Sequence, residues 1–375
     1  MENKITVGVF VILLFSLSIG NLLCGDRIFS DNENRYLASK PPVAVSSVLS
    51  GNYTEKLEAY INDQFVWRDA WISLKTKAQI ALLHKDINGV YMAKDGYLIQ
   101  RVSEQDLDRE QIEENITALN MFFAKTSLPK NNLSLMIVPT SGLILSEKLP
   151  PYAQMFDQNE MIDTIKQSVP NCLFVDLRQQ LLDKKGEYIY YKTDHHWTTR
   201  GAFAAYLSWC ETVGIPSPEA NYSIEEVTDS FHGSLYSKVL YNGVPYDSIS
   251  IFKYQSPHRF LVEYEGGKSQ SDSFYQRERL QEKDKYAVFF GGNHAELKIT
   301  SDNKNNKRLL VIKDSFANAF VPFAAEQFES THMLDLRYFH GNVYDYITNN
   351  DITDILVLYS TVNFASDHNL DKLRY

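Results

Sequence analysis

The sequence predicts an α/β fold, in which a mainly parallel sheet is covered by helices on both faces. Short apolar runs alternate with segments of helical periodicity over residues 108–360. These runs are hydrophobic throughout, as in strands that are buried on both sides. The chain of 375 residues is 44% hydrophobic and 22% charged, which is typical of a globular protein.

The first 25 residues differ from this globular pattern. After Lys4 the chain carries no charge until Asp26. This uncharged segment is long enough for a helix that crosses a bilayer, which takes about 20 residues. A signal peptide has a similar pattern, and Ser18-Ile19-Gly20 fits a cleavage site. We favour an uncleaved signal anchor, which gives a single N-terminal span with the rest of the chain on the extracytoplasmic face of the cell membrane. Cleavage would give a secreted protein.

The next two segments connect this helix to the body. Residues 26–52 are polar and contain Pro41-Pro42, which predicts a linker or extended arm. Residues 53–84 repeat apolar side chains at helical spacing, so we expect one bent helix or two. Residues 87–100 predict a β-hairpin with Asp95-Gly96 in its turn. We place the α/β domain at residues 53–375.

The helices and strands of the α/β domain follow in order. Helices are expected near residues 108–126, 158–168, 199–213 and 316–328. Strands are expected at residues 133–138, 173–176, 286–290, 307–313, 333–339 and 352–360. Residues 216–285 predict a loop-rich insertion with short strands. In such folds ligands bind beyond the carboxyl ends of the strands, which directs attention to the segments that follow them.

Charge and cysteine content narrow the function classes. The net charge of −10 argues against a nucleic-acid partner, because many phosphates would have to be neutralised. Three cysteines without a Cys-x-x-Cys pair exclude a disulfide-built framework and a structural zinc ribbon. We expect no cofactor and no metal.

The segment RLLVIKDSFANAFVPF places Ser315 between an expected strand and an expected helix. Backbone N–H groups at a helix N-terminus favour negative charge. A serine nucleophile beside such donors, here near Phe316, is what acyl transfer needs. An ordinary helix cap at Asp314 or Ser315 explains the same pattern. Both interpretations stay open at this point.

A second segment, KTDHHWTTRG, supplies an acid and two histidines. In an extended or turn segment, residues i and i+2 point to the same side. Asp194 can therefore orient His196, while His195 is expected to point away. This pair could serve Ser315 as base and orienter.

Other interpretations of this segment compete with the triad. A metal site needs at least three ligands, and it would recruit His232, His294 or Asp314 from elsewhere in the chain. We favour the triad over the metal. A structural role is the simplest interpretation of His195. Trp197 is expected to pack the loop, with an indole that faces a sugar as the alternative.

Five segments resemble the DHHW protein family, which is similar to the alginate O-acetyltransferase-like group of SGNH-type hydrolases. They are FSDNENRYL, YINDQFVWRDAWISLKT, INGVYMAKDGYLI, YYKTDHHWTTRGAFAAY and VIKDSFANAF, in order over nearly the whole chain. The resemblance implies an SGNH hydrolase-like fold with permuted motif order, because an Asp-x-His motif precedes the nucleophile. It assigns Asp194 as orienter, His196 as base and Ser315 as nucleophile.

The resemblance also implies an activity. It points to an extracytoplasmic O-acetyltransferase that acts on a cell-surface or secreted polysaccharide through an acyl-enzyme. Such relatives often work beside a membrane-bound O-acyltransferase that supplies acetyl groups. Three alternatives remain: an extracellular carbohydrate acetyl esterase, a catalytically silent polysaccharide-binding or assembly protein, and a metal-dependent hydrolase.

The sequence departs from ordinary SGNH enzymes at several positions. Their Gly-Asp-Ser block is Lys313-Asp314-Ser315 here, and their separate oxyanion donors have no assigned counterpart. Asn293 and Asn342 are candidates for oxyanion or substrate contacts, although plain turns explain both. Arg337, at the end of an expected strand, is a candidate for binding a substrate carboxylate or acetyl oxygen, with a salt bridge as the alternative.

Overall fold

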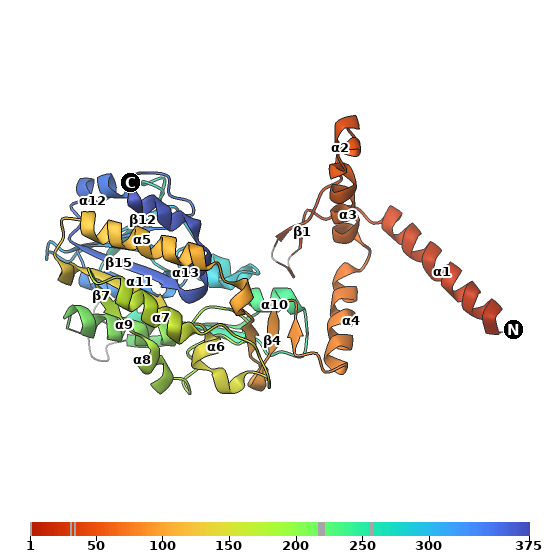
Figure 1. Ribbon diagram of the computed structural model, residues 1–375, viewed down its shortest axis with the longest axis horizontal. Helices are drawn as coiled ribbons and strands as arrows, with labels where there is room; N and C mark the ends of the chain where they lie inside the picture. Colours follow the sequence, from red (N-terminus) through yellow and green to blue (C-terminus); the bar gives the residue numbers. More distant parts are fainter. Residues whose placement is uncertain (1, 31, 34, 217–221, 256–257) are drawn as a thin grey trace. The chain divides into compact units, whose positions relative to one another are not determined.

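The computed structural model describes residues 2–30, 32–33, 35–216, 222–255 and 258–375 (Figure 1). The chain divides into two units. Unit 1 comprises Met1–Asn88 and Tyr236–Gly243, and unit 2 comprises Gly89–Leu235 and Val244–Tyr375. The domain boundaries expected from the sequence, 1–25, 26–52 and 53–375, stay predictions.

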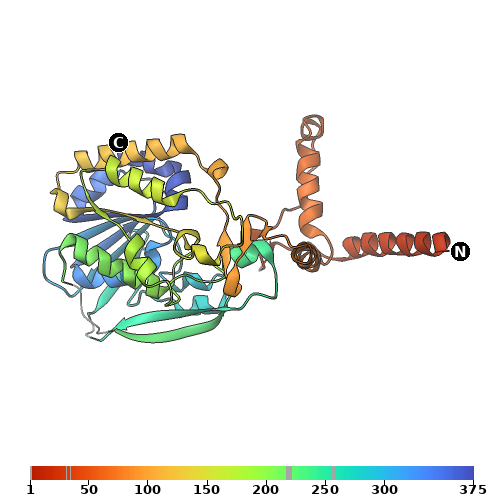
Figure 2. The same cartoon turned by 60° about the horizontal axis from the view of Figure 1, so that its bottom comes forward.

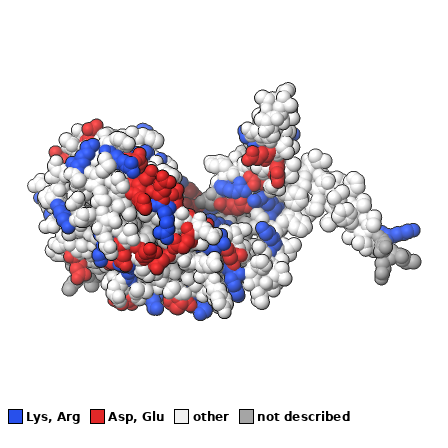
Figure 3. All heavy atoms as spheres, viewed as in Figure 1, with Lys and Arg blue, Asp and Glu red and all other residues white. Residues whose placement is uncertain are grey.

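Unit 1 begins with the apolar helix α1 (Glu2–Leu23). Its segment Lys4–Leu23 has a mean hydropathy of 2.2 and is 0% buried, so by length and composition it can cross a membrane. Figure 3 shows charged side chains on this helix only near its N-terminal end. The arm that follows contains β1 (Phe29–Ser30), β2 (Arg35–Tyr36) and the short helix α2 (Val45–Leu49).

Two helices follow the arm, α3 (Asn52–Gln64) and α4 (Arg68–Ala81). Of the two alternatives expected for residues 53–84, one bent helix or two helices, the structure has the second. The guanidinium of Arg35 donates to both carboxylate oxygens of Asp63, at 2.9 and 2.5 Å, and thereby ties the arm to α3. The strand β3 (Asp86–Ile87) lies near the end of this stretch of unit 1.

Unit 2 contains an eight-stranded sheet of order β11-β10-β12-β14-β13-β15-β6-β7. Its parallel strands are β14 (Ser330–Leu334), β13 (Arg308–Lys313), β15 (Asp354–Ser360), β6 (Leu133–Val138) and β7 (Leu173–Val175). One edge continues antiparallel with β12 (Glu296–Ser301), β10 (Phe260–Tyr264) and β11 (Ser269–Ser271). The expected mainly parallel sheet is confirmed.

Helices cover both faces of this sheet, as expected (Figure 2). Along β13, Leu310 and Ile312 face one core, and Leu309 and Val311 face the other, because side chains alternate along a strand. The first core is closed by α5 (Arg109–Lys125), α7 (Gln158–Ser168), α12 (Val343–Asn349) and α13 (Thr361–Ser366). The second is closed by α6 (Ser141–Ile144), α8 (Arg178–Asp183), α9 (Thr199–Val213) and α11 (Ala317–Ala324).

Smaller elements complete the fold. The expected hairpin is confirmed as β4 (Val90–Met92) and β5 (Leu98–Gln100), with Asp95 and Gly96 at positive φ between them. The segment expected as a loop-rich insertion contains β10, β11, α10 (Ser234–Val239) and the antiparallel pair β8 (Tyr222–Phe231) and β9 (Asp247–Tyr254). Short 3-10 helices lie at Lys94–Gly96, Glu104–Asp106, Lys130–Asn132, Ser146–Lys148, Arg277–Gln281, Lys285–Val288, Ala325–Gln327 and His368–Arg374.

Two expected strands were wrong in detail. Residues 286–290 lie mostly in the 3-10 helix Lys285–Val288, because periodicity cannot separate a short buried strand from a short buried helix. The strand expected at 333–339 is β14, which ends at Leu334. Asp335 then begins a turn, in which its carboxylate accepts from the backbone N–H of Arg337.

Candidate active site

Ser315 lies just beyond the carboxyl end of β13, before α11. The turn is fixed by Asp314, whose buried carboxylate accepts three hydrogen bonds. One comes from the backbone N–H of Phe316 at 2.9 Å, and two come from the Ser360 N–H and the Asn363 amide, at 2.8 Å each. Asp314 is therefore a structural anchor for the serine turn.

The loop that carries the acid and the two histidines is held by Asp247 on β9. The buried Asp247 carboxylate accepts from the backbone N–H groups of Lys192 and Thr193, at 2.7 Å each, and from the hydroxyl of Tyr188. Trp197 is fully buried, and its indole N–H donates to the Phe316 carbonyl at 3.0 Å. Trp197 thus packs the loop and ties it to the serine turn.

These two placements bring Asp194, His196 and Ser315 together. His196 Nδ1 lies 2.6 Å from Asp194 Oδ1, and His196 Nε2 lies 2.7 Å from Ser315 Oγ. All three side chains are buried. A carboxylate at Nδ1 selects the tautomer that carries its proton there, which leaves Nε2 to accept the Ser315 hydroxyl. The three residues form one hydrogen-bonded chain from carboxylate to hydroxyl.

The charge of Asp194 suits this chain. Burial raises the pKa of the carboxyl, but the neighbouring rings of His195 and His196 and hydrogen bonds from His196 and Ser234 lower it more. The net pKa of Asp194 lies below its ordinary value. An ionised Asp194 stabilises an imidazolium at His196.

Three residues that the sequence analysis did not predict also contact Asp194 or His196. The Ser234 N–H donates to Asp194 Oδ2 at 2.8 Å, and a Cβ on Gly233 would lie only 2.2 Å from Asp194 Cβ. The Tyr286 ring stacks on that of His196 at 4.0 Å between centroids. Gly233 and Ser234 lie in the segment expected as a loop-rich insertion, and Tyr286 was expected in a strand, so none carried a local signal of this role.

His195 was expected to point away from Asp194 and His196, and it does not. Its ring lies 3.8 Å from the ring of His196, and its Nδ1 lies 2.7 Å from the Ser234 hydroxyl. The expectation was wrong because residues 192–196 form a bend instead of an extended segment. The His195 side chain is about one-third exposed, so it can meet a ligand beside the triad.

Asp194, His195 and His196 also form a group that could hold a metal, with one ligand atom of each within 4.8 Å of the others. Among the described residues, neither His232, His294 nor Asp314 joins this group. Both ring nitrogens of His196 already make hydrogen bonds, to Asp194 and to Ser315. A metal bound by His196 would therefore break one link of the chain.

The expected oxyanion donor differs from what the backbone offers. The Phe316 N–H donates to Asp314, whereas the Ser315 N–H has no hydrogen-bond partner among the described residues. The Phe316 ring lies 4.9 Å from the ring of His196. The Phe316 ring therefore lies beside His196, and the backbone N–H without a partner among the described residues of this turn is that of Ser315.

The remaining candidates lie in structural interactions. Asn293 Oδ1 accepts from Lys313 Nζ at 2.8 Å. Arg337 donates to both oxygens of Asp335, at 2.8 and 2.6 Å. Asn342 caps α12, and within the described chain it makes no hydrogen bond with the triad residues.

Comparisons with known proteins identify relatives. The model of the DHHW protein family matches residues 145–334, which include Asp194, His196 and Ser315. A crystal structure of a DHHW family protein from Eubacterium siraeum is 27% identical, covers 76% of this chain and 95% of that chain, and has a TM-score of 0.65. No curated protein matches the chain.

A second protein of known structure is similar over a comparable length. PatB1 from Bacillus cereus is 26% identical, with 73% of this chain and 97% of that chain covered and a TM-score of 0.61. A PatB1 structure with a sulfonyl adduct is 24% identical, with coverages of 76% and 98% and a TM-score of 0.64. These structures share the fold of this chain.

Proposed function

The chain belongs to the DHHW protein family, and we propose that it is an extracytoplasmic serine O-acetyltransferase that acetylates a polysaccharide. One observation carries the proposal: the hydrogen-bonded chain from Asp194 through His196 to Ser315. A hydroxyl bonded to a base that a carboxylate orients is the arrangement of nucleophilic acyl transfer.

In the first half of the reaction, Ser315 Oγ attacks the carbonyl carbon of an acetyl donor. His196 Nε2 takes the hydroxyl proton, and Asp194 stabilises the imidazolium that results. The Ser315 N–H donates to the oxyanion. The bond to the donor's leaving group breaks, the leaving group takes the proton from His196, and an acetyl ester remains on Ser315.

In the second half, a sugar hydroxyl gives its proton to His196 and attacks the acetyl ester. The new ester forms on the sugar, and Ser315 Oγ leaves with the proton from His196. Water in place of the sugar would release acetate, which is the reaction of an acetyl esterase. The choice of acceptor is thus the difference between the two activities.

We place this reaction at the extracytoplasmic face of the cell membrane, with α1 as the single span. Support comes from the length and apolar composition of α1. A membrane-bound O-acyltransferase is the proposed source of the acetyl groups, and the polysaccharide is the acceptor.

The test compares Ser315→Ala with the wild-type chain in detergent. Each is given an activated acetyl ester, with and without an oligosaccharide acceptor. Ser315→Ala is expected to lose at least about 10³-fold in ester cleavage, because the nucleophile is gone. Labelling by a sulfonyl fluoride is expected to disappear with it, since that reagent class modifies activated hydroxyls.

The matched control is Ser134→Ala, which removes a buried serine hydroxyl on β6, and it is expected to retain cleavage and labelling. Acetate as the sole product with every acceptor would favour the esterase. Full activity in Ser315→Ala would contradict the mechanism. Loss of wild-type activity with a chelator would favour the metal-dependent alternative.

A further inference from the structure

The last turns of α1 pack on the connection between α3 and α4. Asn21 Oδ1 accepts from the Val66 N–H at 2.7 Å. Gly20 faces the same residue, since a Cβ built there would lie 3.5 Å from a Val66 methyl group. Cleavage after Gly20 would therefore remove part of a packed contact, which favours a retained helix.

The neighbouring Trp67 is exposed in an unusual way. Trp67 is 71% exposed, and its backbone is left-handed with a φ of 55°, which is rare for a residue with a bulky side chain. Trp71, one turn along α4, is 40% exposed. Trp67 lies just before α4, which begins at Arg68, whereas Trp71 lies within the helix.

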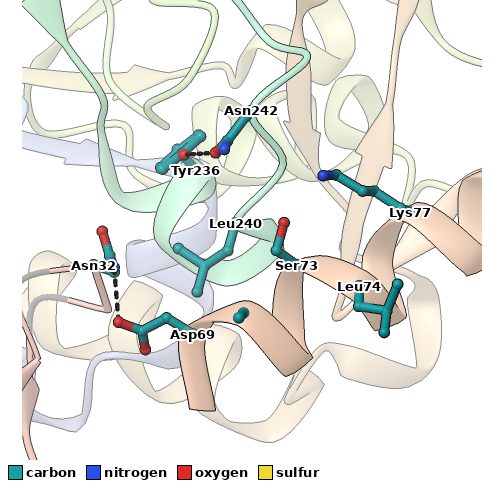
Figure 4. A pocket seen from close by; sticks show the side chains of 9 residues that line it. Asn32, Asp69, Ser73, Leu74, Lys77, Tyr236, Leu240 and Asn242 are labelled. Atoms are coloured by element: carbon teal, nitrogen blue, oxygen red, sulfur yellow. Dashed lines mark hydrogen bonds between the residues drawn. The ribbon is translucent and has the colours of Figure 1, made fainter. Parts of the chain in front are cut away.

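Another part of α4 lines a hollow of mixed polar and apolar side chains. Asp69, Ser73 and Lys77 line a hollow of about 490 Å³ within unit 1, together with Tyr236 and other residues (Figure 4). Neither Trp67 nor Trp71 lines this hollow. The large exposed side chain of Trp67, on a left-handed backbone, indicates a contact with something apolar.

A second hollow, of about 530 Å³, lies at the end of α1. Its lining includes Cys24, Arg27, Phe65, Trp67 and Arg68. The apolar segment of α1 ends at Leu23, so in a membrane this hollow would lie where the hydrocarbon gives way to lipid headgroups. Tryptophan favours this layer, because its indole can lie partly in apolar surroundings with its N–H toward the headgroups.

We propose that the Phe65–Arg68 connection contacts the membrane that α1 crosses, and that the Trp67 side chain is inserted among the lipid headgroups. The proposal rests on the anchor of the proposed function and is independent of its chemistry. The occupant is the bilayer, because Val66 contacts α1 at Gly20 and Asn21 and so fixes Trp67 near the depth at which the apolar segment ends.

The test places the full chain in nanodiscs whose phospholipids carry bromine in the upper acyl chain, and measures quenching of tryptophan fluorescence. Trp67→Phe is expected to lower the quenchable emission at least about twofold relative to wild type, because Trp67 lies nearest the lipid. Trp71→Phe is the matched control and is expected to retain most of the quenching.

Equal quenching in Trp67→Phe and wild type would overturn the proposal. The absence of quenching in the wild type would also overturn it, because that result is expected if a protein partner covers the Phe65–Arg68 connection. An intact mass that lacks the first 20 residues, in protein recovered from cells, would also overturn it. None of these outcomes depends on acetyl transfer, so they are separate from a failure of the proposed function.

Discussion

Lys313 and Ser315 lie two residues apart at the carboxyl end of β13, yet their polar atoms are used differently. Lys313 is 1% exposed, and its Nζ donates to Asn293 at 2.8 Å and Asn318 at 2.9 Å. Asp335 lies 3.6 Å from the same nitrogen. Ser315 Oγ instead ends a single chain of hydrogen bonds, and its backbone N–H has no partner among the described residues.

The difference separates a closed network from an open one. Around Lys313 the polar atoms of the buried Asn318 and Asp335 face its Nζ, and Arg337 donates to both oxygens of Asp335. Such a network stabilises one arrangement of the strand ends. Around Ser315 a donor is left available and a proton can move to His196, which is what a reaction requires.

The largest expected effect breaks the open network. His196→Ala is expected to lower kcat/KM for acetyl transfer about 10⁴-fold, because the serine loses its base. His195→Ala is expected to stay within about tenfold of wild type, since its Nδ1 is bonded to the Ser234 hydroxyl, whereas the hydrogen bond to Ser315 Oγ comes from His196. Steady-state transfer to an oligosaccharide measures both, and equal losses would show that the two histidines share the base role.

The next effect breaks the closed network. Lys313→Met is expected to lower the free energy of unfolding by about 3 kcal/mol, because Asn293 and Asn318 lose a buried donor. Chemical denaturation of the full chain in detergent measures it. Lys304→Met, at an exposed lysine, is the control and is expected to be nearly neutral. A Lys313→Met variant as stable as wild type would mean that the network does not hold the strand ends.

The same lysine gives a pH dependence. Burial lowers the pKa of Lys313 to about 8 from its ordinary value of 10.5, although Asp335 opposes this shift. Between these two values the unfolded chain binds the proton that the folded chain has released, so this group's contribution to stability increases as pH rises through the window. In Lys313→Met this part of the slope is expected to vanish.

The sequence predicted what depends on local pattern. Strands such as β6 and β13 are buried on both faces, so they appear as continuous apolar runs. The relation of Asp194 to His196 follows from spacing within one segment, and the position of Ser315 follows from the strand before it.

Long-range contacts escaped sequence reasoning. Asp247 holds the histidine loop, but it lies more than 50 residues from Lys192 in sequence. Tyr286 and Gly233 meet the triad only after the sheet and its insertion have packed together. The direction of His195 was missed because a bend does not follow the alternation of an extended strand.

The smallest expected effect sharpens the comparison, because it disturbs the open network without removing a polar group. In Gly233→Ala, the new Cβ would meet Asp194 Cβ at 2.2 Å and Oδ2 at 2.4 Å, so the carboxylate has to move. A displacement of about 1 Å in an orienting group costs on the order of 10²-fold in rate. We expect this loss in kcat with KM little changed, because Gly233 is a positioning residue that acts through Asp194.

The matched control for this prediction is Gly186→Ala, where no atom lies within 4 Å of the added Cβ, and it is expected to leave kcat unchanged. Unfolding of Gly233→Ala, measured alongside, separates displacement of Asp194 from loss of fold. A full kcat in this variant would show that the backbone at 233 yields before the carboxylate does. The orientation of His196 would then depend on its own contacts with Asp194 and Tyr286 instead of on close packing behind the acid.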